Sequence, residues 1–122
     1  MPDGLLKFLL FFFRAEGRIG RSEYALGVGL IYTVNAAVLS FALVHMEFDT
    51  DGLGLVAVAG LPSFAALCVL VAKRCHDLGL PASFVLLLFV PAIGLIWLVA
   101  LAFVQGTPGP NLYGPEPRYR PD

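Results

Sequence analysis

The residues best suited to chemistry lie in one short run, Lys73-Arg74-Cys75-His76-Asp77, of this 122-residue chain. The adjacent histidine and aspartate of this run could act as a general acid and a general base. Neighbouring residues do not face each other on a helix, so His76 and Asp77 would need a partner from elsewhere in the chain. The run therefore supplies candidate acid–base groups without specifying a complete catalytic site.

The same run lacks the spacing of a metal site. Cys75 and His76 could both bind zinc, but no second pair of ligands follows at the spacing that zinc sites use. Cys68 and Cys75 are seven residues apart, which is too far for a disulfide along one helix. We therefore expect two free thiols, no metal and no cofactor.

A second group of charges precedes the first long apolar stretch: Arg14, Arg18 and Arg21, followed by Glu23. Two interpretations remain open. The arginines could hold this end in the cytoplasm and contact anionic lipid. Alternatively, Arg18 or Arg21 could pair with Glu23 and Asp77, because a guanidinium can bind a carboxylate through two hydrogen bonds.

Three long apolar stretches separate the polar segments, at about residues 25–44, 53–72 and 82–104. Each can cross a bilayer, which takes ~20 apolar residues. The chain is 58% hydrophobic and 14% charged, against roughly 45–50% and 25% in soluble domains. We therefore expect one integral membrane domain of the all-α class, a small bundle of three transmembrane helices, which excludes most soluble enzymes.

The segments before and after the three apolar stretches are too short or too irregular to cross the bilayer. Residues 5–13 would span only about 14 Å as a helix, so we expect a helix lying in the membrane interface. Residues 105–122 are rich in proline and glycine, which predicts an irregular tail. Pro91 and Gly94 leave an alternative for the third stretch, which could turn back there as two half-helices.

The distribution of positive charge predicts the orientation. Four Lys or Arg residues precede the first stretch, none lies between the first and second, and two lie between the second and third. The positive-inside rule then places the amino terminus in the cytoplasm of a multi-pass protein. Three crossings would put the tail outside, whereas a turn at Pro91–Gly94 would return it to the cytoplasm.

Few polar residues lie inside the apolar stretches. Asn35 is expected to hydrogen-bond to another helix, or else to line a solute path. No charged residue lies deep in a stretch, which argues against ion-coupled transport. The small pairs Ala25/Gly29 and Ala59/Ser63 permit close helix contact, within one chain or between copies. No basic stripe indicates nucleic-acid binding.

Three polar segments occur in order with apolar stretches between them: Gly17-Arg18-x-x-Arg21-x-Glu23-Tyr24, Lys73-Arg74-Cys75-His76-Asp77, and Gly106-Thr-Pro-Gly-Pro-Asn111-x-Tyr113-Gly114-Pro-Glu-Pro117. Together they resemble the domain of unknown function 805 family of small bacterial inner-membrane proteins. The chain departs from that pattern at Ala25 and Cys75, where the family has tryptophan and leucine, and at Ser83-Phe84, where it has an aromatic pair. The resemblance implies a bacterial inner-membrane location and a helical bundle, and it implies no activity.

These observations favour a structural or accessory membrane protein over an enzyme. It would bind lipid or a protein partner through a cytoplasmic face of Arg, Glu, His and Asp side chains. The alternative is a passive channel or small-solute pathway built as a homo-oligomer, and a membrane enzyme using His76 and Asp77 comes third. The candidate binding or structural residues are Arg18, Arg21, Glu23, Tyr24, Asn35, Arg74, His76, Asp77, Asn111 and Tyr113.

Overall fold

The computed structural model describes residues 3–14, 16–46 and 50–115 of the chain. Within these ranges the chain forms four α-helices and one 3-10 helix, in this order: α1 (Asp3–Phe13), α2 (Arg21–His45), α3 (Thr50–Asp77), η1 (Ala82–Phe89) and α4 (Pro91–Phe103). The fold is thus all-helical, as the apolar stretches predict.

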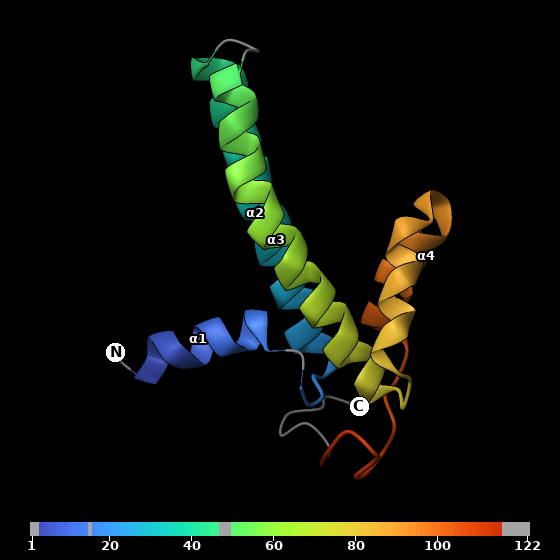
Figure 1. The fold of residues 1–122 in the computed structure, drawn as a ribbon. Coiled ribbons are helices and arrows are strands. Elements are labelled where there is room, and N and C mark those ends of the chain that lie inside the picture. The colour runs from blue at the N-terminus through green and yellow to red at the C-terminus, as the bar shows by residue number, and fades with distance from the viewer. Residues whose placement is uncertain (1–2, 15, 47–49, 116–122) are drawn as a thin grey trace.

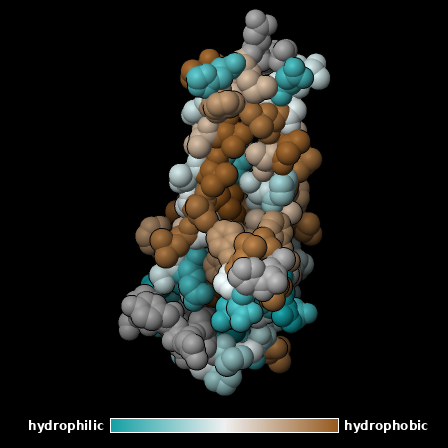
Figure 2. Space-filling view, turned by 90° about the vertical axis from the view of Figure 1, so that its left-hand side faces the viewer, coloured by the Kyte–Doolittle hydropathy of each residue, from teal (hydrophilic) through white to brown (hydrophobic). Residues whose placement is uncertain are grey.

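The two longest helices, α2 and α3, form an antiparallel hairpin that is the main body of the molecule (Figure 1). They have 25 and 28 residues and are apolar enough to cross a membrane. At 1.5 Å per residue they are roughly 37 and 42 Å long, which exceeds the ~30 Å hydrocarbon core. Their large apolar side chains, such as Leu26, Val58 and Leu61, are mostly exposed rather than packed inside. Figure 2 shows this apolar surface as a brown band between hydrophilic ends.

Helix α1 lies crosswise at one end of the α2–α3 hairpin (Figure 1). Phe12 is its buried residue, whereas Leu5, Phe8 and Phe13 are exposed by about half. The helix expected at residues 5–13 is therefore present and starts two residues earlier. Its crosswise direction suits a helix that lies in a membrane interface.

The third apolar stretch does not form one continuous helix, so the expected single helix over 82–104 is wrong. It is split into η1 and α4, with Val90 between them in an extended conformation. Pro91 explains the break because proline disfavours a helical conformation at the preceding residue. The two pieces lie side by side as a short hairpin (Figure 1), which matches the alternative of a turn at Pro91–Gly94.

The turn of this hairpin is tight at Gly94. Its amide donates to the carbonyl oxygen of Val90 at 2.6 Å. A Cβ atom at Gly94 would lie 2.8 Å from the carbonyl oxygen of Leu88 and 2.9 Å from that of Leu87. Both obstacles are backbone atoms, so only glycine fits without moving the chain.

We predict that Gly94→Ala destabilises the η1–α4 hairpin by about 1–3 kcal/mol, because the added methyl group overpacks against backbone. Thermal unfolding of the purified protein in detergent, followed by circular dichroism, measures the effect. Gly54→Ala in α3 is the control, since a Cβ atom there has nothing within 4 Å. Equal melting temperatures for wild type and Gly94→Ala would contradict the tight turn.

Candidate functional site

Three polar segments from distant parts of the chain meet at one end of the molecule. They are the link before α2 (residues 14 and 16–20), the carboxyl end of α3, and residues 104–115 after α4 (Figure 1). We call this region the polar end. Six of the ten candidate residues lie here, three more (Arg21, Glu23 and Tyr24) follow in the first turn of α2, and Asn35 lies elsewhere.

Asp77 is at the centre of the polar end and binds two arginines. Its Oδ1 accepts a hydrogen bond from Arg18 Nε at 3.0 Å and lies 2.9 Å from Arg18 Nη2. Its Oδ2 pairs with Arg74 Nη1, one helical turn earlier on α3. The side chains of Arg74 and Asp77 are 0% exposed and that of Arg18 is 1% exposed. The pairing of Arg18 with Asp77, one of the two interpretations that the sequence leaves open, is therefore present, and it forms a buried Arg–Asp–Arg cluster.

Arg18 also binds the segment that follows α4. Its Nη1 donates to the carbonyl oxygens of Gly109 at 2.7 Å and Gly114 at 3.2 Å, and its Nη2 donates to that of Thr107 at 2.5 Å. One guanidinium thus fixes the 107–114 backbone against α3. Buried carbonyl groups need such donors, because an unsatisfied polar group in an apolar setting costs about 1–3 kcal/mol.

Arg74 caps the carboxyl end of α4. It donates to the carbonyl oxygens of Leu101 (2.7 Å), Val104 and Ile19 (3.3 Å). Arg21 donates to the carbonyl oxygen of Phe103 at 3.3 Å. The last carbonyls of a helix lack partners within the helix and carry partial negative charge, so the arginines satisfy and neutralise this end.

Lys73 plays the same part for α1. It is only 5% exposed, its ammonium group donates to the carbonyl oxygen of Phe11, and it lies 4.5 Å from the centre of the Phe11 ring. Lys73 was not among the candidates, although a basic residue at the end of an apolar helix could have suggested this role.

The carboxyl end of α3 itself is closed by a Schellman motif. Leu80 N donates to Cys75 O at 2.8 Å and Gly79 N donates to His76 O at 3.0 Å. Gly79 has a φ of +78°, the left-handed conformation that this motif requires. The backbone amide of Thr107 donates to Asp77 O at 2.7 Å, so another carbonyl group at this end of α3 has a partner.

His76 is held against the tail rather than against Asp77. Its ring is stacked on Tyr113, with centroids 4.1 Å apart and planes at 5°. Nδ1 lies 3.0 Å from Gly17 O, so Nδ1 carries the proton because a carbonyl only accepts. Asn111 Nδ2 donates to the backbone oxygen of His76 at 2.9 Å. His76 and Asp77 therefore have separate partners and form no acid–base pair.

Tyr24 and Glu23 occupy the first turn of α2 but have different surroundings. Tyr24 is buried, and its hydroxyl donates to Leu98 O of α4 at 2.6 Å. Glu23 lines a groove between α1 and α2 and makes no ion pair within the described ranges. The pairing of Glu23 with Arg18 or Arg21, which the sequence left as an alternative, is thus not formed. Arg18 donates to Asp77 and to the 107–114 backbone, and Arg21 donates to Phe103 O of α4.

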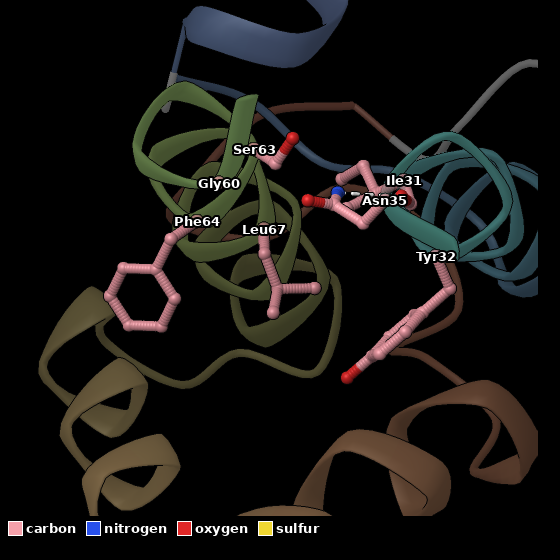
Figure 3. Close-up of a pocket in the computed structure, with 7 residues that line it drawn as sticks. All are labelled: Ile31, Tyr32, Asn35, Gly60, Ser63, Phe64 and Leu67. Atoms are coloured by element: carbon pink, nitrogen blue, oxygen red, sulfur yellow. Dashed lines mark hydrogen bonds between the residues drawn. The ribbon is translucent and has the colours of Figure 1, made fainter. Parts of the chain in front are cut away.

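Asn35 lies far from the polar end, in a pocket of about 210 Å³ between α2 and α3 (Figure 3). Its Nδ2 donates to Ile31 O of its own helix at 2.8 Å, so the expected hydrogen bond to another helix is wrong. Ser63 on α3 likewise donates to Ala59 O at 2.7 Å. The remaining pocket residues include Ile31, Phe64 and Leu67, which are apolar.

The chemistry available at the polar end is therefore electrostatic. Within residues 3–14, 16–46 and 50–115, no three His, Cys, Asp or Glu side chains come close enough together to hold a metal. The buried guanidinium groups of Arg18 and Arg74 donate to carbonyl and carboxylate oxygens, and these hydrogen bonds hold separate segments of the chain together.

Comparison with known proteins places these observations in a family. The family described as "Protein of unknown function (DUF805)" matches residues 12–115. Inner membrane protein YhaH of Escherichia coli K12 is 32% identical over 123 residues, covering 98% of this chain and 99% of that protein. Inner membrane protein YhaI of the same strain is 32% identical over 106 residues, covering 85% of this chain and 86% of that protein. No solved structure matches the chain.

We predict that Asp77→Asn lowers stability by about 3–5 kcal/mol, because breaking a buried ion cluster leaves charges without their counterion. Abundance in isolated membranes and the melting temperature in detergent measure the loss. The matched control is Glu16→Gln, which removes an acid from an exposed pair with Arg14 and should change little. If both variants behave alike, the cluster does not stabilise the fold.

Proposed function

This chain belongs to the DUF805 family, and we propose that it is an integral inner-membrane protein with a structural or accessory role. The relatives YhaH and YhaI are named inner membrane proteins, which supports the location. Helices α2 and α3, which are long and apolar enough to cross a bilayer, support membrane integration.

In the proposed topology α2 and α3 cross the membrane and the polar end faces the cytoplasm. Six positive charges precede α2, lie at its start or end α3: Lys7, Arg14, Arg18, Arg21, Lys73 and Arg74. The sequence from residue 46 to residue 52, between the bodies of α2 and α3, has no Lys or Arg. The positive-inside rule supports this orientation. Helix α4 has 13 residues and would reach only ~20 Å, so the η1–α4 hairpin would enter the bilayer from the cytoplasmic end and return to it.

One observation carries the structural role: Arg18, Arg74 and Asp77 are buried at the polar end and bind one another or backbone carbonyls. A catalytic group must reach its substrate, but the side chains of Arg18, Arg74 and Asp77 are at most 1% exposed. This arrangement favours a structural role for these residues over a catalytic one. Its accessible surface, and not the buried cluster, would contact a protein partner.

The 111–114 turn is part of that surface. Asn111 and Gly114 pair through two backbone hydrogen bonds of 3.0 and 3.2 Å, and Asn111 Oδ1 accepts from Tyr113 N at 2.8 Å. Leu112 at its tip is 96% exposed. A rigid turn that presents an apolar side chain suits recognition by a protein partner, since little ordering is needed on binding.

The passive-channel alternative has less support. The polar side chains Thr33, Asn35 and Ser63 all donate to carbonyls of their own helices. One copy therefore offers no continuous polar path across the described parts of α2 and α3.

Photocrosslinking in cells tests the accessory role. We expect a benzophenone amino acid at Leu112 to give a discrete protein adduct, because the turn would lie in a partner interface. The same probe at Leu61, which is 73% exposed on α3 between the ends, is the control for random collision.

Two results would contradict the proposal. One is an identical adduct pattern from both positions. The other is solute flux through liposomes containing the purified protein that is abolished by Asn35→Leu, which would instead support a channel.

A further inference from the structure

An open groove of about 270 Å³ lies in the corner where α1 meets α2. Its wall includes Phe8, Phe11 and Phe12 of α1 and Glu23, Leu26 and Leu30 of α2. The three α2 residues are spaced by three and seven positions, so they share one face of that helix. Among all the lining residues Glu23 alone carries a charge. The groove therefore combines one carboxylate with an otherwise apolar and largely aromatic wall.

Gly27 allows the aromatic side of the groove to form against α2. A Cβ atom at this position would lie 3.3 Å from Cε1 of Phe11 and 2.8 Å from Cδ1 of Leu70, so a larger residue would push α1 and α3 away from α2. The ring centroids of Phe11 and Phe12 are 5.1 Å apart, and those of Phe8 and Phe12 are 5.0 Å apart. The three rings thus form one aromatic cluster beside the first turns of α2.

The carboxylate of Glu23 is half-buried and has no cation in contact with it within the described ranges. Lys73 is the neighbouring cation, and its charge interacts with that of Glu23 through space. The ammonium group of Lys73 donates to Phe11 O instead, so the two side chains form no ion pair. A carboxylate that has lost part of its water is stabilised by a cation in direct contact. Glu23 therefore offers an acceptor for a cationic ligand.

A carboxylate beside aromatic rings is suited to an organic ammonium group. An aromatic ring attracts a cation that lies within about 6 Å of its centre, and a carboxylate accepts charge-assisted hydrogen bonds from ammonium hydrogens. The same cluster already binds one ammonium group, because Lys73 Nζ lies 4.5 Å from the centre of the Phe11 ring. The negative charge of Glu23 disfavours a phosphate or a carboxylate at this position.

The apolar part of the wall extends along α2 away from the polar end. Leu26 and Leu30 lie roughly 5 and 10 Å farther along the helix than Glu23, at 1.5 Å per residue. They are 75% and 42% exposed, so both are accessible to an apolar chain. Helix α1 lies crosswise at the same end (Figure 1), which puts Glu23 and the rings at the headgroup level of the proposed topology. This order of carboxylate and apolar residues matches an amphiphile and not a water-soluble amine.

We propose that the α1–α2 groove binds a phospholipid with a primary ammonium headgroup. The ammonium group contacts Glu23 and the aromatic cluster, and one acyl chain lies along Leu26 and Leu30. Charge complementarity selects the headgroup, and the apolar face of α2 selects the chain. The site rests on the membrane topology proposed above, but it shares no residue with the turn around Leu112. The lipid-binding test and the crosslinking test can therefore fail independently.

Native mass spectrometry of the full chain tests this site. The protein is released from detergent micelles that contain equal amounts of phosphatidylethanolamine and its N-acetyl derivative, which has the same chains and phosphate but no ammonium group. Wild type should retain phosphatidylethanolamine in preference to the derivative. Glu23→Gln should lower this retention about fivefold, the upper factor for a partly exposed ion pair. Ethanolamine at the same concentration as the lipid should not displace it, because ethanolamine has no acyl chain.

A variant of the aromatic cluster separates lipid binding from folding. Phe8→Leu keeps an apolar side chain but removes the ring, and it should lower retention about threefold, within the range of an exposed cation–π interaction. Phe8 is 52% exposed, so the melting temperature should stay near that of wild type. Phe13→Leu is the matched control, since Phe13 is 53% exposed on the same helix but does not line the groove. Glu16→Gln is the control for charge, because Glu16 is exposed at the same end and pairs with Arg14. Both controls should retain the lipid as wild type does.

Three outcomes would overturn the proposal. The first is equal retention of the two lipids by wild type. The second is unchanged retention in Glu23→Gln and Phe8→Leu. The third is displacement of the lipid by an equal concentration of ethanolamine, which would make a free amine the ligand.

Discussion

Carboxyl ends of three helices meet in one small volume, and the rest of the structure depends on satisfying their carbonyl groups. Helices α1, α3 and α4 all finish at the polar end. Each brings carbonyls without partners and a partial negative charge. Lys73 caps α1 and Arg74 caps α4, so two adjacent residues of α3 serve two different helices. Asp77 then balances the arginines and fixes their geometry.

This constraint explains why the third apolar stretch can turn back. A short hairpin such as η1–α4 buries little and leaves most of its apolar side chains, such as Leu86, Phe89 and Ile96, exposed. Its packing alone would hold it weakly in lipid, where helices gain no hydrophobic stabilisation from each other. Polar contacts stabilise the hairpin where it returns. Arg74 and Tyr24 donate to carbonyl groups of α4, and Arg18 donates to the 107–114 backbone.

Apolar length and charge distribution were sufficient to predict the helices α1, α2 and α3 within a few residues. They left the pairing of Arg18 with Asp77 as one of two open interpretations. They were not sufficient to choose between one crossing and a hairpin over residues 82–104. That choice depends on Pro91 together with the contacts of Arg74, which join residues far apart in sequence. Asn35 and Glu23 were misjudged for the same reason: a side chain's type suggests that it needs a partner, but only the fold decides which one. The capping role of Lys73 was visible only once α1 was placed against α3. Residues 116–122 of the expected tail lie outside the described residues.

The return of the third apolar stretch should bring the tail to the same side of the membrane as the amino-terminal link. The most direct test is labelling of Leu112→Cys in a Cys68→Ser background by a membrane-impermeant maleimide in spheroplasts. Cys75 can remain because it is 0% exposed, and the background without Leu112→Cys is the blank. Thr50→Cys, at the opposite end of α3, is the control that should label in intact spheroplasts. We expect Leu112→Cys to label only after permeabilisation, and labelling in intact spheroplasts would contradict the account.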